Sequence, residues 1–183
     1  MEFYSQSRFS NWINKIAETA IDESNPETFT VFDQMLEDVI IACLSIVRAV
    51  NEREIRKADA VKEIDRIFEI LPNHEFDDEL KNELFQYTLE SIKAVLLSFK
   101  LYFEGKISKK NFESLLKDAL KEEKKGDYEA SLNAVALMGA KVIKGEKLPE
   151  LDIPEDSAII SWIDGIDAIS SVIELSRIDA PAE

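Results

Sequence analysis

The spacing of apolar residues restricts the fold of this chain more than any other feature of its sequence. In seven segments, apolar side chains recur every three to four residues, and no segment alternates apolar and polar residues as a strand would. The segments cover, approximately, residues 7–20, 26–51, 55–71, 77–103, 108–125, 127–144 and 154–177. The pattern predicts an all-α fold: one domain over residues 1–183, built as a compact helical bundle of about seven helices.

Three of these segments are apolar on most of their sides: 26–51, 77–103 and 154–177. Helices of that kind are buried, so we place them at the centre of the bundle. The other four carry one apolar stripe each and are expected to pack around the centre. Ser108 is expected to cap the helix that follows it, and residues 1–6 and 178–183 are expected to be flexible ends.

A weak internal repeat connects the helices. The repeated pattern consists of an apolar helix, a tight turn, one apolar residue and a further helix. It recurs after 52 residues, so that the single apolar residue is Ile55 in the first copy and Ile107 in the second, and a third, partial copy has Leu148 at this place. These three apolar residues are expected to seat the turns against the core. The repeat fits duplicated helix-turn-helix pairs, and it also fits the short loops that join antiparallel helices in any bundle.

The charge of the chain excludes two classes of partner. With 37 acidic and 22 basic residues the formal net charge is -15, so nucleic acid and anionic membrane surfaces would repel the protein. The longest apolar passage, 39–50, contains Ser45 and Arg48 and is too short to span a bilayer. No secretory signal is visible, and the lone Cys43 suits a reducing compartment. We therefore expect a cytoplasmic protein.

Few groups in the sequence are suited to catalysis. The sequence has a single histidine, His74, and a single cysteine, Cys43. Sites that need two histidines or two cysteines, such as di-iron and multi-cysteine zinc sites, are therefore excluded. Cys43 lies in the most apolar stretch of its helix and is expected to be a buried, inert thiol. We assign no catalytic residue, no cofactor and no metal ligand.

Two aspartates in the last helix are the polar residues of most interest. Asp164 and Asp167 are three residues apart, so they share one face of the helix. That face is either a solvated surface or, if the helix is deeply buried, one wall of a polar pocket for a cation or a basic ligand. His74, in a polar turn between Pro72 and Phe76, is either an exposed loop residue or a further group of such a site.

Aromatic residues gather near the start of the sequence. They are Phe3, Tyr4, Phe9 and Trp12. Aromatic side chains are enriched where proteins meet, so the cluster is a candidate anchor that docks onto another chain. The alternative is that the four residues fold back and cap their own bundle.

Two stretches of the sequence resemble a known family. They are Phe3-Tyr4-Ser5 with Arg8-Phe9-Ser10-Asn11-Trp12-Ile13, and Asp38-Val39-Ile40-Ile41-Ala42-Cys43-Leu44-Ser45-Ile46-Val47. In these stretches the chain looks like a family of small acidic archaeal proteins of unassigned function, and the likeness covers mainly the first hundred residues. The resemblance implies a cytoplasmic archaeal protein without known activity, and it transfers no functional residue to this sequence.

The function that these observations favour is non-enzymatic. We expect a helical protein-protein interaction or assembly protein whose acidic surface meets a basic partner or a second copy of the chain. The alternative is an enzyme, or a protein that binds a small ligand or a cation, with its site between helices near Asp164 and Asp167.

Overall fold

Seven α-helices and one short 3-10 helix make up the computed structural model, which describes residues 1–178. In chain order they are α1 (Gln6–Glu18), the 3-10 helix η1 (Pro26–Phe29), α2 (Thr30–Asn51), α3 (Lys57–Glu69), α4 (Glu79–Phe103), α5 (Phe112–Lys124), α6 (Tyr128–Lys144) and α7 (Ile160–Ile178). Residues 1–178 contain no strand, so the expected all-α fold is confirmed. Of the expected flexible end 178–183, residues 179–183 lie outside the described part. None of the described helices is both long and apolar enough to cross a membrane.

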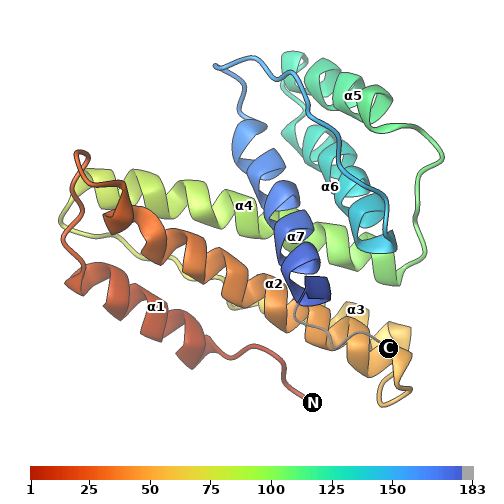
Figure 1. The fold of residues 1–183 in the computed structure, drawn as a ribbon, viewed down its shortest axis with the longest axis horizontal. Coiled ribbons are helices and arrows are strands. Elements are labelled where there is room, and N and C mark those ends of the chain that lie inside the picture. The colour runs from red at the N-terminus through yellow and green to blue at the C-terminus, as the bar shows by residue number, and fades with distance from the viewer. Residues whose placement is uncertain (179–183) are drawn as a thin grey trace.

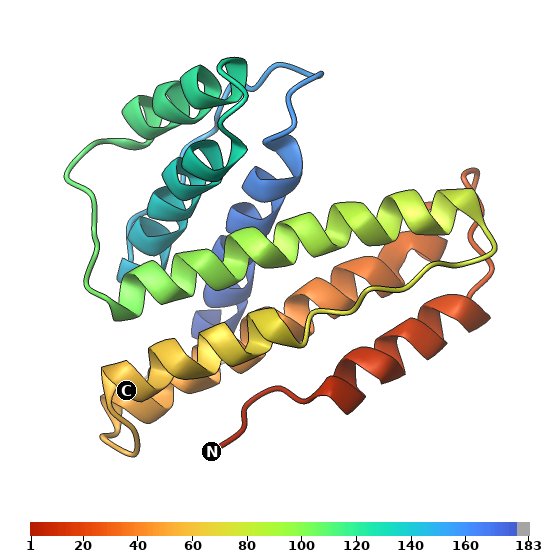
Figure 2. The ribbon, with the colours of Figure 1, turned by 180° about the vertical axis from the view of Figure 1, so that it is seen from behind.

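α4 is the central helix of the fold. It packs against α2, α3, α6 and α7, while α1 lies along α2 and α5 along α6. Figure 1 shows α7 crossing α2 and α4, and Figure 2 shows the same arrangement from behind, with α1 to α3 on one side of α4 and α5 and α6 on the other. Residues 145–159 run back along α6, so that α6 and α7 point in the same direction (Figure 1).

Three helices begin at least four residues later than expected: α2, α5 and α7. α5 starts at Phe112, and the expected cap Ser108 is wrong: the side chain of Asn111 accepts the hydrogen bond from Ser114 N–H (2.8 Å). The hydroxyl of Ser108 instead accepts a bond from Lys110 N–H (3.1 Å), which closes a local turn before the helix. The 26–51 segment begins as η1 rather than as an α-helix.

The start of α7 is set by a tertiary contact. The helix begins at Ile160, several residues later than the expected start after Pro154. Glu123, at the end of α5, accepts hydrogen bonds from the hydroxyl of Ser157 (2.7 Å) and from the backbone N–H of Ala158 (2.6 Å). These bonds tie the segment before α7 to another helix, and no local sequence pattern reports such a contact.

α6 lies deeper in the fold than its sequence predicts. We expect one apolar stripe at the edge of the bundle, but the helix packs against α4, α5 and α7. Its buried residues are mostly small: Ser131, Ala134, Val135, Ala136, Met138, Gly139, Ala140, Lys141 and Val142. Small side chains let several helices approach closely, yet they add little to an apolar pattern, and the burial of α6 is therefore hard to detect in the sequence.

Two glycines let α4 contact its neighbours at the backbone. A Cβ atom on Gly165 of α7 would lie 2.5 Å from the backbone oxygen of Ser91, and a Cβ on Gly139 of α6 would overlap the side chain of Ser98. The hydroxyl of Ser91 also donates a hydrogen bond to the carbonyl of Ser161 on α7 (2.6 Å). α7 and α4 are thus joined by direct contact of their main chains.

Four helices end with the same turn. One or two residues after the end of α2, α4, α5 and α6, the backbone takes the left-handed conformation. The residues are, in that order, Arg53 (φ 61°), Gly105 (φ 73°), Gly126 (φ 79°) and Gly145 (φ 116°). The N–H that follows each of them donates to a carbonyl five residues earlier: Glu54 to Ala49, Lys106 to Leu101, Asp127 to Glu122, and Glu146 to Lys141. This pattern satisfies carbonyls that a helix end leaves free.

The shared helix ending accounts for the internal repeat. Arg53 and Gly105 are 52 residues apart, and Ile55, Ile107 and Leu148 follow such turns and are half-buried, as expected. Each of the helices that come next packs mainly against the helix that follows it, α3 against α4 and α5 against α6, and α3 also contacts α2. The shared helix ending is sufficient to explain the repeat, and duplication of helix pairs stays a prediction.

We expect Gly165→Ala to destabilise the protein, although alanine favours a helix more than glycine. The new methyl group would meet the main chain at Ser91, which no side-chain rotation can relieve, so α7 must move away from α4. Overpacking costs about 1–3 kcal/mol, whereas alanine adds about 1 kcal/mol to helix stability. Thermal unfolding should show a Tm lower by several degrees, while Ser171→Ala on the exposed side of α7 leaves it unchanged. A Tm equal to or above that of the wild type would contradict the close contact.

Candidate functional site

An acidic groove lies between α2, α4 and α7. It has a volume of about 330 Å³ and is lined by Phe32, Asp33, Leu36, Glu37, Tyr87, Thr88, Ser91, Asp164, Asp167, Ala168, Ser171, Val172 and Leu175. Four of these residues carry carboxylates, and none of the lining residues is basic. We call this surface the acidic groove.

Helical spacing brings the four carboxylates to the groove from two sides. Asp33 and Glu37 are one turn apart on α2, and Asp164 and Asp167 lie on α7. The close contact of α7 with α4 places Asp164 beside Tyr87, whose hydroxyl donates a hydrogen bond to Asp164 Oδ2. Each wall therefore contributes a pair of acids, and α4 contributes a phenol between them.

Within residues 1–176, whose side chains the structure describes, the carboxylates of the groove have no basic partner. None of the four takes part in an ion pair with a residue of that range. Burial raises the pKa of Asp33, and the charge of Asp164 raises it further. Burial also raises the pKa of Tyr87, followed by its hydrogen bond to Asp164, so the phenol stays a neutral donor. The groove thus holds negative charge that nothing in the described chain neutralises.

Apolar surface accompanies this charge. The floor of the groove contains the buried or nearly buried side chains of Phe32, Leu36 and Val172. Leu175 lines the groove and is 58% exposed, and Ile41, one turn beyond Glu37 on α2, is 53% exposed. Large apolar side chains left in water beside a groove are typical of surfaces that contact another molecule.

The structure brings together two of the three residues predicted for a ligand pocket. Asp164 and Asp167 are exposed to solvent, and both line the groove. His74 does not line it: the residue is exposed in the turn before α4, where its ring packs edge-on against Phe76, with the ring centroids 4.6 Å apart. A site that contains all three residues is therefore not formed.

Sequence reasoning missed three residues of the groove: Asp33, Glu37 and Tyr87. The acids of α2 were detectable in principle, because their spacing puts two charges on one face of a largely apolar helix. Nothing around Tyr87 in the sequence distinguishes it from other aromatic residues. Its role depends on the contact between α4 and α7.

The N-terminal aromatic residues fold back onto the chain. Tyr4 and Phe9 are each 1% exposed, with their ring centroids 4.6 Å apart, and Phe3 and Trp12 are partly buried against the core. Docking of these residues onto another chain stays a prediction, and Tyr4 and Phe9 would first have to leave the core. The expected flexibility of residues 1–6 also stays a prediction.

Asp38 of α2 collects the hydrogen bonds that hold this segment. It accepts one from the hydroxyl of Tyr4 (2.9 Å), one from the indole N–H of Trp12 (2.9 Å) and one from the guanidinium of Arg8 (2.5 Å). Arg8 also lies over the Tyr4 ring, 4.3 Å from its centroid. Burial opposes the ionisation of Asp38, but the three donors and the charge of Arg8 outweigh it and hold the pKa of Asp38 below its usual value.

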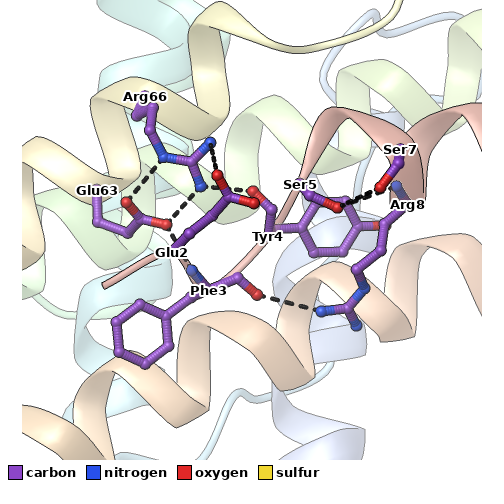
Figure 3. Close-up of polar contacts among 8 residues, drawn as sticks. All are labelled: Glu2, Phe3, Tyr4, Ser5, Ser7, Arg8, Glu63 and Arg66. Atoms are coloured by element: carbon purple, nitrogen blue, oxygen red, sulfur yellow. Dashed lines mark hydrogen bonds and ion pairs between the residues drawn. The ribbon is translucent and has the colours of Figure 1, made fainter.

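A second set of contacts fastens the segment to α3 (Figure 3). Glu63 Oε1 accepts hydrogen bonds from the backbone N–H of Phe3 (2.8 Å) and from Arg66 (2.6 Å), and Arg66 donates a further bond to the carbonyl of Tyr4 (2.5 Å). Burial opposes the ionisation of Glu63, but the bonds from Arg66 and Phe3 hold its pKa below the usual value. We call the contacts that Asp38 and Glu63 make with this segment the N-terminal clasp. Because these groups bind one another, we assign the clasp a structural role.

Acid should weaken the N-terminal clasp. The folded-state pKa values of Asp38 and Glu63 lie below their unfolded values of about 4, so their stabilisation is complete above pH 4 and is lost as the pH falls through the folded values. We expect Tm to fall below about pH 4, and Asp38→Asn to lower Tm at neutral pH and to make the acid dependence shallower. Asp156→Asn, at an exposed position, is the control. An identical pH dependence in the wild type and in Asp38→Asn would contradict the assignment.

Removing one charge from the groove should stabilise the fold. Because the pKa of Asp33 is raised, its ionised form is disfavoured in the folded protein, and this cost is present at neutral pH and disappears as the pH falls through the unfolded value. We expect Asp33→Asn to raise Tm slightly at pH 7 and to make no difference below about pH 4. Asp22, whose pKa is lowered by hydrogen bonds from Ser24, provides the opposite case, so Asp22→Asn should not raise Tm. A lower Tm for Asp33→Asn at neutral pH would contradict the view that the folded protein disfavours the ionised form of Asp33.

A family model matches nearly the whole chain. Its description is "Uncharacterized protein conserved in archaea (DUF2150)", and the match runs from residue 2 to residue 179. The resemblance seen in the sequence is thereby confirmed and extends beyond the first hundred residues. Comparison with curated proteins found no match, and neither did comparison with solved structures. The chain belongs to the archaeal family DUF2150.

Proposed function

We propose that this protein is a non-enzymatic binding protein, whose acidic groove holds a basic, amphipathic helical segment of a partner protein. The observation that carries the proposal is the set of four carboxylates on the two walls of the groove, none of them in an ion pair within residues 1–176, beside an apolar surface. The proposal includes a cytoplasmic location, to which a single unpaired cysteine is suited.

The composition of the groove defines the partner. Its walls offer negative charge on both sides, from Asp33 and Glu37 on α2 and from Asp164 and Asp167 on α7. A helix with an apolar stripe flanked by lysine or arginine satisfies the walls and the floor together, as in other proteins that bind a helix in a groove. The net charge of -15 would in addition speed the approach of a basic partner.

Two other occupants fit the groove less well. Within residues 1–178 no group of three His, Cys, Asp or Glu side chains is placed to hold a metal ion, whereas an extended basic segment can reach the carboxylates one by one. A second copy of the chain would have to present a basic surface rather than its own groove. The exposed lysines nearest to such a surface are Lys117 and Lys121 of α5 and Lys125, which follows that helix. Self-association is therefore measured alongside peptide binding.

The test uses a labelled amphipathic Leu–Lys helical peptide and the matching Leu–Glu peptide, with fluorescence anisotropy as the readout. We expect saturable binding of the Leu–Lys peptide only, weakened by added salt. The double variant Asp164→Asn with Asp167→Asn should weaken binding by roughly tenfold. Asp152→Asn with Asp156→Asn removes the same charge from exposed positions outside the groove and should have little effect.

Two results would overturn the proposal. The first is no saturable binding of the Leu–Lys peptide. The second is an equal loss of affinity in the two double variants, which would mean that overall acidity attracts the peptide and that the groove has no part in it. Light scattering on the free protein tests the alternative that a second copy of the chain fills the groove. A dimer that dissociates when Lys117 and Lys121 are replaced by Glu would assign the groove to that second copy.

A further inference from the structure

We infer that a second pocket binds a small organic anion that carries a phosphate group. The pocket lies where α2, α4 and α6 end and α3 begins, and its volume is about 200 Å³. It shares no residue with the acidic groove, and the inference does not depend on the proposed function.

Four polar side chains from four helices meet at this pocket. They are Asn51 of α2, Lys57 of α3, Tyr102 of α4 and Lys144 of α6. All four can donate hydrogen bonds. Within residues 1–176, whose side chains the structure describes, none of these four side chains takes part in a hydrogen bond or an ion pair. Their donors are therefore available to a ligand.

The charge of the pocket is opposite to that of the protein. Lys57 and Lys144 line it, and no carboxylate does, in a chain with 37 acidic residues against 22 basic ones. Some other lysines are paired with acids, for example Lys100 with Asp65 (2.6 Å). A phosphate monoester carries about -1.5 to -2 charges at neutral pH, which two ammonium groups match.

The helix ends around the pocket do not cancel this charge. A helix end carries roughly half an elementary charge, negative at the C-terminus, and three such ends lie here, for a total of about -1.5. The lysines and the N-terminal end of α3 supply about +2.5, which leaves the pocket positive by about one charge. The carbonyls of the three ends are also partly engaged, since Glu54, Lys106 and Glu146 donate backbone bonds back into their helices.

The remaining wall is apolar and indicates an organic ligand. Val47, Val50, Phe103 and Ile107 line the pocket beside the ring of Tyr102. Inorganic phosphate would leave this surface without a partner, whereas the carbon skeleton of a phosphate ester covers it. Lysine binds phosphate as a compact point charge, and the two lysines match the charge of a phosphate monoester better than the single charge of a carboxylate.

The experiment titrates the whole, isotope-labelled protein with phenyl phosphate, benzoate and inorganic phosphate, and follows backbone amide shifts by NMR. We expect saturable shifts at Val50, Gly105 and Ile107 with phenyl phosphate, and weaker binding of the other two probes. The double variant Lys57→Gln with Lys144→Gln should reduce the affinity for phenyl phosphate by roughly tenfold. The control, Lys117→Gln with Lys121→Gln, removes the same charge from the exposed face of α5 and should leave it unchanged.

Each contrary outcome overturns a stated part of the inference. The pocket is rejected if those amides show no saturable shift, or if the Lys57 and Lys144 variant binds as tightly as the control. The choice of phosphate is rejected if benzoate binds as tightly as phenyl phosphate, and the organic ligand is rejected if inorganic phosphate does. Both lysines are exposed, so the variants should retain the fold, and the dispersion of their amide signals verifies this.

Discussion

The direct contact of α7 with the main chain of α4 is the constraint on which the rest of the structure depends. It exists because residue 165 has no side chain, and because the hydroxyl of Ser91 can reach across to a carbonyl of α7. The same contact sets Asp164 beside Tyr87 and closes one wall of the acidic groove. Packing that stabilises the fold therefore also builds the surface to which we assign binding.

Two aspartates of α2 show how strongly the surroundings determine the role of a residue. Asp38 receives three donors, its pKa is lowered, and its charge stabilises the folded chain. Asp33 lies on the same helix, but partial burial and the charge of Asp164 raise its pKa and disfavour its ionised form. The basic segment that we propose for the groove would give this carboxylate a favourable partner, and residues that do not favour the stability of the isolated protein are common at binding surfaces.

The sequence predicts the helices well and the contacts between them poorly. Apolar spacing identified all seven helices, and Gly105 and Gly145 marked two of their ends, since these are local properties. The start of α7 depends on Glu123 of another helix, and the burial of α6 rests on small residues that carry almost no pattern. In the site, Asp164 and Asp167 share one helix face and could be found, whereas their meeting with Tyr87 results from tertiary packing.

The return of residues 145–159 along α6 has a consequence for the order in which the molecule is assembled (Figure 1). Because α7 is synthesised after α2 and α4, the walls of the groove come from segments that leave the ribosome at very different times. Until α7 docks, the apolar flanks of the two earlier helices remain in water, and the charged cleft does not yet exist. The surface to which we assign binding is therefore complete only once α7 has docked.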